Sequence, residues 1–263
     1  MTRQIAELLM YVAPEPIQQA NERWLARILE RLGSTRRGAG GLPLLELWRA
    51  PELLLTQTCG YPLMTALRGQ VRVVGRPRYE LPEASGGNHC SLLLSRTDDP
   101  RRTLPDFFNS RGVINGEDSN SGMNLLRQRL APLHRDGQFF THVGISGSHR
   151  ESLRWLRDDL ADLAAIDSVT FAYLARHAGQ EVRGLRVVER SASSPTLPYI
   201  TAVTASDEQV TALRRVMNET LGELPEVAEV LGLSEVLPAG EEDYQVLLDY
   251  QREAQGLGYG RVR

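Results

Sequence analysis

Residues 115–124, which read NGEDSNSGMN, carry the side chains best suited to bind a ligand. They lie between a short apolar run at 112–114 and a run with leucines at helical spacing at 125–130, a pattern that predicts a strand, a polar loop and a helix. The loop holds three helix-capping residues and a glycine: Ser119, Asn120, Ser121 and Gly122. Glycine lets a bound group approach the backbone, and N–H groups at a helix start attract negative charge. The stretch predicts a pocket for a small oxyanion; a helix cap that binds nothing is the alternative.

Three further polar turns follow expected strands, at 56–61, 146–149 and 167–168. Their candidate ligand-binding residues are Thr58, Tyr61, Ser148, His149, Asp167 and Ser168. Ser148 and Glu151 have the spacing of a capping box, which places His149 in the first turn of a helix. In a sheet with parallel strands, ligands bind beyond the carboxyl ends of the strands. We therefore expect these turns and the 119–122 loop to gather around one anion.

Asp167 is an unusual residue for an anion site, because a carboxylate repels an anion. A monoprotonated phosphate, a phosphonate or an attached ammonium could donate a proton to Asp167, whereas sulfate could not. The site would then select ligands that carry a proton. The alternatives are that Asp167 caps a helix beside Ser168 and that His149 is an exposed histidine at a helix start.

The composition is that of a globular protein of 263 residues, with 41% hydrophobic and 24% charged residues. A formal charge of −3 does not indicate the basic surface that binds nucleic acid, and no apolar run is long enough to predict membrane insertion. The sequence has no lysine, which excludes a Schiff-base or P-loop lysine. Cys59 and Cys90 have no metal-ligand spacing. We therefore predict no metal, no cofactor and no catalytic residue.

Strands and helices alternate along the chain, beginning with a strand at 4–12 and a helix at 15–32. This alternation predicts an α/β fold with mainly parallel sheets. Residues 223–240 are expected to be irregular, and a helix is expected to follow them. Breaks in the pattern predict two lobes, one of residues 1–97 plus 192–263 and the other of residues 98–191.

The N-terminal residues predict the first strand of the fold, because they lack the apolar core and cleavage site of a signal peptide. This favours a cytoplasmic location as the sequence stands, or a periplasmic one if a leader has been removed.

Taken together, these features resemble the substrate-binding proteins of phosphate, phosphite and phosphonate ABC transporters. The resemblance covers most of the chain. It rests on Tyr11 in the opening strand, the 119–124 loop, the 147–149 turn, the strand end at 164–168, the return at 193–198, and residues 243–244 and 258–259. It implies a type 2 periplasmic-binding-protein-like fold, in which two α/β lobes are joined by two crossing hinge strands and close on the ligand.

The resemblance also implies roles for single residues. In one lobe the oxyanion would be held by Ser119, Asn120, Ser121 and His149, with Asp167 and Ser168 completing the site. The opposite lobe would contribute Tyr11 and the turn from Thr58 to Tyr61. Asn120 stands where the family often has threonine, and Ser168 stands where an aromatic side chain can cover the ligand's organic group, so the preferred ligand can differ.

The function predicted is therefore non-enzymatic binding of a small oxyanion of the phosphate, phosphite or phosphonate type, with an ABC-transporter permease as a partner. One alternative is a leaderless cytoplasmic enzyme on the same fold, resembling menaquinone-pathway enzymes, with His149 and Asp167 as acid and base. Another is a protein that keeps the fold but senses ligands or serves as a scaffold for partners.

Overall fold

The computed structural model describes residues 3–263, which form two compact units. Unit 1 comprises the residues up to Asn88 together with Pro195–Tyr244, and unit 2 comprises His89–Ser194 and Gln245–Arg263. This division differs from the predicted lobes in where the first crossing falls and in the assignment of the C-terminal segment. The reason is strand and helix packing: β6 (Ser91–Arg96) pairs with strands of unit 2, and α9 (Gln245–Gly256) packs on a helix of unit 2.

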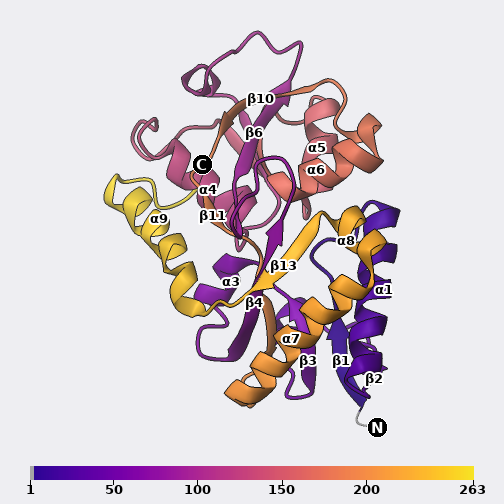
Figure 1. Cartoon of the computed structure of the whole chain (residues 1–263). Helices are drawn as coiled ribbons and strands as arrows, with labels where there is room; N and C mark the ends of the chain where they lie inside the picture. The colour runs from indigo at the N-terminus through magenta and orange to yellow at the C-terminus, as the bar shows by residue number, and fades with distance from the viewer. Residues whose placement is uncertain (1–2) are drawn as a thin grey trace. The chain divides into compact units, whose positions relative to one another are not determined.

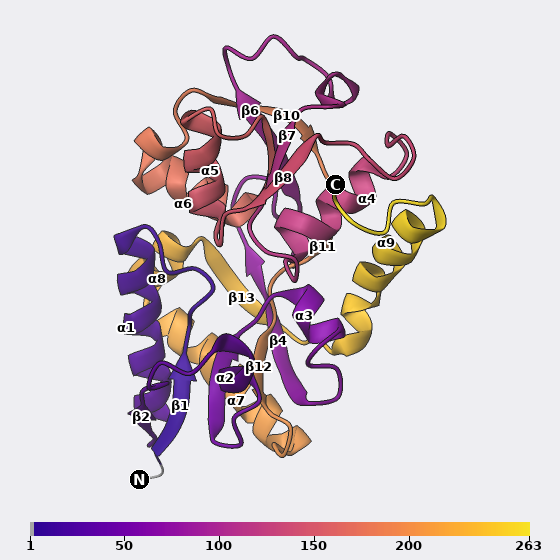
Figure 2. The same cartoon turned by 180° about the vertical axis from the view of Figure 1, so that it is seen from behind.

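Unit 1 is built on a six-stranded sheet. The strand order is β13 (Leu233–Leu237), β4 (Val71–Tyr79), β12 (Tyr199–Ala202), β3 (Leu53–Gln57), β1 (Arg3–Glu7) and β2 (Thr35–Arg37). The helices are α1 (Glu15–Arg31), α2 (Leu44–Trp48), α3 (Gly60–Met64), α7 (Asp207–Glu223), α8 (Pro225–Leu231) and the 3₁₀ helix η4 (Glu241–Tyr244). Figure 1 shows α7 in front of this sheet, and Figure 2, from behind, shows α2 in front of it.

Helix α1 shows why the helix at 15–32 could be predicted from its pattern. Its buried face carries Ile17, Trp24 and Ile28 at helical spacing, and the indole Nε1 of Trp24 donates to Thr220 Oγ1 of α7 at 3.1 Å. The apolar face that the sequence pattern predicts is therefore the face that packs against α7.

The prediction that residues 223–240 are irregular was wrong. Pro225 begins α8, Gly232 ends it with a φ of +55°, and β13 follows at once. Proline at a helix start and glycine at a helix end are signals that a short element shares with a loop.

Unit 2 is built on a five-stranded sheet. The strand order is β10 (Leu185–Arg190), β6, β9 (Leu163–Asp167), β7 (Arg111–Ile114) and β8 (His142–Ile145). The expectation of mainly parallel sheets needs correction, since both sheets are mixed. The first strand after a chain crossing in each unit, β6 or β12, runs antiparallel to both neighbours.

The helices of unit 2 cover both faces of its sheet (Figures 1 and 2). They are α4 (Leu125–Leu130), α5 (His149–Arg157), α6 (Ser168–His177) and α9, with η1 (Leu104–Phe107), η2 (Asn120–Asn124) and η3 (Gly179–Glu181) as short turns. The core under α5 and α6 is formed by Leu92, Val113, Leu153, Leu156 and Ile166 with their neighbours. Two short strands, β5 (Asn88–His89) and β11 (Ser194–Pro195), pair with each other where the chain passes between the units. Within the described residues, no helix is both long and apolar enough to cross a bilayer.

Candidate functional site

The loop that follows β7 enters its helix through a π turn. The Asn124 N–H donates to the Ser119 carbonyl, and the Leu125 N–H donates to the Asn120 carbonyl, so both bonds span five residues. Ser119 begins this turn, and its Oγ accepts from the Gly122 N–H at 3.0 Å. The strand, polar loop and helix were predicted, but the wider π turn was not. Such turns are frequent at functional sites.

Contacts with neighbouring side chains require a glycine at position 122. A Cβ at this position would lie 1.8 Å from Asn115 Oδ1 and 3.2 Å from His149 Cε1. The approach of a bound group to this glycine stays a prediction. The missing side chain lets the loop and α5 approach each other.

Ser121 and His149 are brought together as the sequence predicted. Ser121 Oγ lies 2.8 Å from His149 Nε2, and the two residues start η2 and α5. The backbone of the same turn is fixed by Ser91 of β6, whose Oγ donates to the Ser121 carbonyl at 2.8 Å. Ser121 is buried, so this hydroxyl is held in one place.

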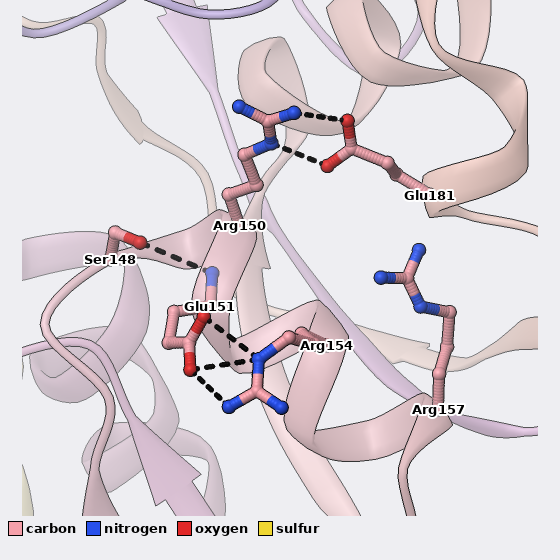
Figure 3. Close-up of a pocket in the computed structure, with 6 residues that line it drawn as sticks. All are labelled: Ser148, Arg150, Glu151, Arg154, Arg157 and Glu181. Atoms are coloured by element: carbon pink, nitrogen blue, oxygen red, sulfur yellow. Dashed lines mark hydrogen bonds and ion pairs between the residues drawn. The ribbon is translucent and has the colours of Figure 1, made fainter.

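Ser148 has the predicted capping role but lies apart from the buried group. Its Oγ accepts from the Glu151 N–H at 3.1 Å, while the Glu151 carboxylate binds Arg154 instead of closing a capping box. Ser148 is exposed and lines a surface hollow of about 470 Å³. The other residues around the hollow are Arg150, Glu151, Arg154, Arg157 and Glu181 (Figure 3).

Asp167 caps α6 and is paired with a histidine that the sequence reasoning missed. Asp167 Oδ1 accepts from the Thr170 N–H at 2.9 Å, which confirms the capping alternative. Asp167 Oδ2 lies 3.0 Å from His89 Nδ1, and both side chains are buried. The only local signal for His89 was its position after the 86–88 turn and before the next strand.

The strand pairing explains why His89 meets Asp167. The Ser168 N–H donates to the Cys90 carbonyl at 3.0 Å, and Ser91 lies opposite Asp167 in the β6–β9 ladder. His89 thus precedes β6 at the level where β9 ends. Ser168 is buried beside Cys90, whose N–H lies 3.5 Å from Ser168 Oγ.

Burial and charge have opposite effects on the pKa values of Asp167 and His149. Burial raises the pKa of Asp167, but attraction to His89 and His149 and the Thr170 N–H outweigh burial and lower the pKa to about 2. Burial lowers the pKa of His149, against the attraction of Asp167, and His89 lowers it further. Asp167 is therefore ionised at neutral pH, and the uncharged form of the His149 ring is favoured.

Asn120 uses its side chain inside the protein. Its Nδ2 donates to Ser194 Oγ at 3.1 Å, and its Oδ1 accepts from Asn124 Nδ2 at 3.1 Å. These bonds hold the π turn from two sides. A role for Asn120 in ligand contact stays a prediction.

The remaining predicted residues, Tyr11, Thr58 and Tyr61, belong to unit 1. All three are buried. The Tyr11 ring packs edge-on against Tyr79 with centroids 6.1 Å apart, Thr58 Oγ1 donates to the Cys59 carbonyl at 3.3 Å, and Tyr61 lies in α3. Their role in a ligand site stays a prediction.

The described residues contain no group of three or more His, Cys, Asp or Glu side chains that could hold a metal ion. The chemistry available in unit 2 is hydrogen bonding and charge: two serine hydroxyls at one turn, a histidine bonded to one of them, and a buried aspartate–histidine pair.

Comparisons with known proteins identify one matching family and several solved structures with a similar fold. A family model described as "ABC transporter, phosphonate, periplasmic substrate-binding protein" matches residues 52–244. Comparison with proteins of curated function gives no match. Similar solved structures include a binding protein component of an ABC phosphonate transporter from Pseudomonas aeruginosa, with 16% identity, 98% of this chain and 87% of that chain covered, and a TM-score of 0.78.

Two further solved structures resemble this chain. PhnD1 from Prochlorococcus marinus in complex with methylphosphonate has 10% identity, with 97% of this chain and 98% of that chain covered and a TM-score of 0.71. XAC2383 from Xanthomonas citri bound to ATP has 14% identity, with 98% of this chain and 97% of that chain covered and a TM-score of 0.63. At these identities the structural matches show the fold, which is that of periplasmic binding proteins.

Proposed function

Because the chain belongs to the family of periplasmic substrate-binding proteins of phosphonate ABC transporters, we propose that unit 2 binds a small phosphonate-type oxyanion. Phosphate and phosphite belong to the same ligand class. The methylphosphonate bound to PhnD1 supports an alkylphosphonate as the first ligand to test.

The hydrogen bond between Ser121 and His149 carries this proposal. When a proton is on His149 Nε2, the imidazole donates to Ser121 Oγ and leaves the serine O–H hydrogen free to donate to an anion oxygen. An anion beside the ring would favour the charged form of the histidine and strengthen the bond. His149 lies in the first turn of α5, where the positive end of the helix dipole also favours negative charge.

Binding without chemical change is the second part of the proposal. The enzyme alternative needs His149 and Asp167 as acid and base. A carboxylate whose pKa is lowered to about 2 is a weak base at neutral pH, and both Asp167 oxygens already have partners. Recovery of the ligand unchanged after long incubation with the protein would agree with binding, and a new product in the ³¹P spectrum would contradict it.

The cellular role follows from the family. We propose that the chain works in the periplasm and delivers its ligand to the permease of an ABC transporter. Fractionation of cells that express the native gene, together with co-purification of the permease in the presence of ligand, tests these two points.

Thermal unfolding with added ligands tests the function itself. At a concentration 100 times its dissociation constant, a ligand adds about 2.7 kcal/mol to the free energy of unfolding. We expect methylphosphonate, phosphate or phosphite to raise the melting temperature, with sodium sulfate at equal ionic strength as the control. The absence of any shift with these three oxyanions would contradict the proposal.

A further inference from the structure

Asp167 has no carboxylate oxygen left without a protein partner. Oδ1 accepts from the Thr170 N–H at 2.9 Å, and Oδ2 lies 3.0 Å from His89 Nδ1. An ionised carboxylate only accepts hydrogen bonds, so this contact is favourable when a proton is on His89 Nδ1. The negative charge that could have attracted an ammonium group is thus already held inside unit 2.

The other nitrogen of the same ring, Nε2, has no hydrogen-bond partner in the part of the chain that the structure describes. His89 Nε2 is buried and makes no hydrogen bond with the described residues, and the His89 side chain is 0% exposed. A buried polar atom left in this state costs about 1–3 kcal/mol. In the imidazolium form Nε2 carries a hydrogen, which an anion oxygen can accept.

The carboxylate in contact with this ring already has protein partners at both oxygens, which makes it a poor partner for a ligand cation. Asp167 is the carboxylate in contact with His89, and His149, at the start of α5, is the other titratable group that interacts with both. A ligand ammonium near Asp167 would have to displace His89 or lie beside two imidazoles. An oxyanion, in contrast, would meet the O–H donor of Ser121 and an N–H donor of His89.

We propose that His89 is a specificity residue that makes the site select oxyanions without an ammonium group, such as methylphosphonate, over aminoalkylphosphonates. This inference rests on the proposed function. It differs from the expectation from the sequence, in which a monoprotonated phosphate, a phosphonate or an attached ammonium donates to Asp167. The residue responsible is one that pairs with Asp167 only because β6 and β9 are neighbours.

Isothermal titration of the wild-type chain with methylphosphonate and with 2-aminoethylphosphonate tests the inference without any variant. We expect the dissociation constant for methylphosphonate to be at least tenfold lower. Equal affinities, or tighter binding of 2-aminoethylphosphonate, would overturn the inference while leaving the proposed function intact. Binding of neither compound, nor of phosphate or phosphite, would instead overturn the proposed function.

The substitution His89→Gln then tests the residue itself. It removes the imidazole that contacts Asp167 Oδ2, so the preference for methylphosphonate over 2-aminoethylphosphonate is expected to fall at least tenfold. His142→Gln, at an exposed histidine of β8, is the matched control and is expected to keep the wild-type ratio. An unchanged ratio in a folded His89→Gln protein would overturn the assignment; if that variant does not fold, the wild-type ratio decides.

Discussion

Ser121 Oγ and His149 Nε2 lie 2.8 Å apart, and their hydrogen bond joins the starts of two helices that are 28 residues apart in the sequence. The serine comes from the π turn after β7, and the histidine from the first turn of α5. Each segment alone reads as an ordinary helix start. Their contact brings a hydroxyl and an imidazole from two separate segments into one hydrogen-bonded pair.

The first prediction concerns this bond. Ser121→Ala is expected to weaken methylphosphonate binding by about 10- to 100-fold, since a hydrogen bond to a charged group contributes about 1.5–3 kcal/mol. Ser206→Ala, which removes a hydroxyl from the start of α7 in unit 1, is the control and is expected to leave the affinity unchanged. Calorimetric titration of both variants measures the difference. Equal affinities in the two variants would contradict a role for Ser121.

The second prediction concerns the close approach at Gly122. Gly122→Ala places a methyl group against Asn115 and His149, and crowding of this kind costs about 1–3 kcal/mol of unfolding free energy. Gly222→Ala in α7 is the matched control, because nothing lies within 4 Å of its Cβ and alanine favours a helix by about 0.8–1.0 kcal/mol. Denaturant unfolding should show a lower unfolding free energy than wild type for Gly122→Ala and a higher one for Gly222→Ala. Similar stability of the two variants would argue against the contact.

The third prediction concerns acid stability. The pKa of Asp167 is lowered to about 2 in the folded protein, so its ionised form stabilises the fold above the unfolded pKa of about 3.9. This stabilisation, about 3 kcal/mol, is lost as the pH falls from about 4 to about 2. The difference in unfolding free energy between the wild-type protein and Asp167→Asn should therefore shrink over that range. Urea unfolding at several pH values measures it, and a constant difference would contradict the ion pair.

The fourth prediction concerns His149. Burial lowers its pKa below 6.5 in the free protein, so the unfolded chain binds more protons there and this residue destabilises the fold as the pH falls below 6.5. A bound anion favours the charged ring, so saturating methylphosphonate should raise the titration midpoint. Ring NMR signals, assigned by comparison with His149→Gln, follow both effects. A midpoint that ligand leaves unmoved would place the anion away from His149.

The sequence predicted the elements whose signals are local. Trp24 and Ile28 show helical spacing within one helix, and Ser206 and Gln209, three residues apart, form a capping box at the start of α7. The 119–122 loop and the turn before α5 were found because small polar residues follow a strand in each case. In each of these cases the residues that carry the pattern lie within a few positions of the helix or loop that they predict.

The parts that could not be predicted depend on distant contacts. His89 meets Asp167 only through the pairing of β6 with β9, which no spacing near His89 reveals. The π turn at Asn120 has the same polar and apolar pattern as an α-helix start, so periodicity cannot separate the two. The crossing before His89 was placed too late because β6 reads as a continuation of the strands before it.

Calorimetric titration of the wild-type chain with methylphosphonate measures whether the protein binds a phosphonate-type oxyanion. We expect saturable binding at one site, with the ligand recovered unchanged and with affinity reduced at least tenfold in Ser121→Ala. A folded protein that shows no saturable heat with methylphosphonate, phosphate or phosphite would contradict it.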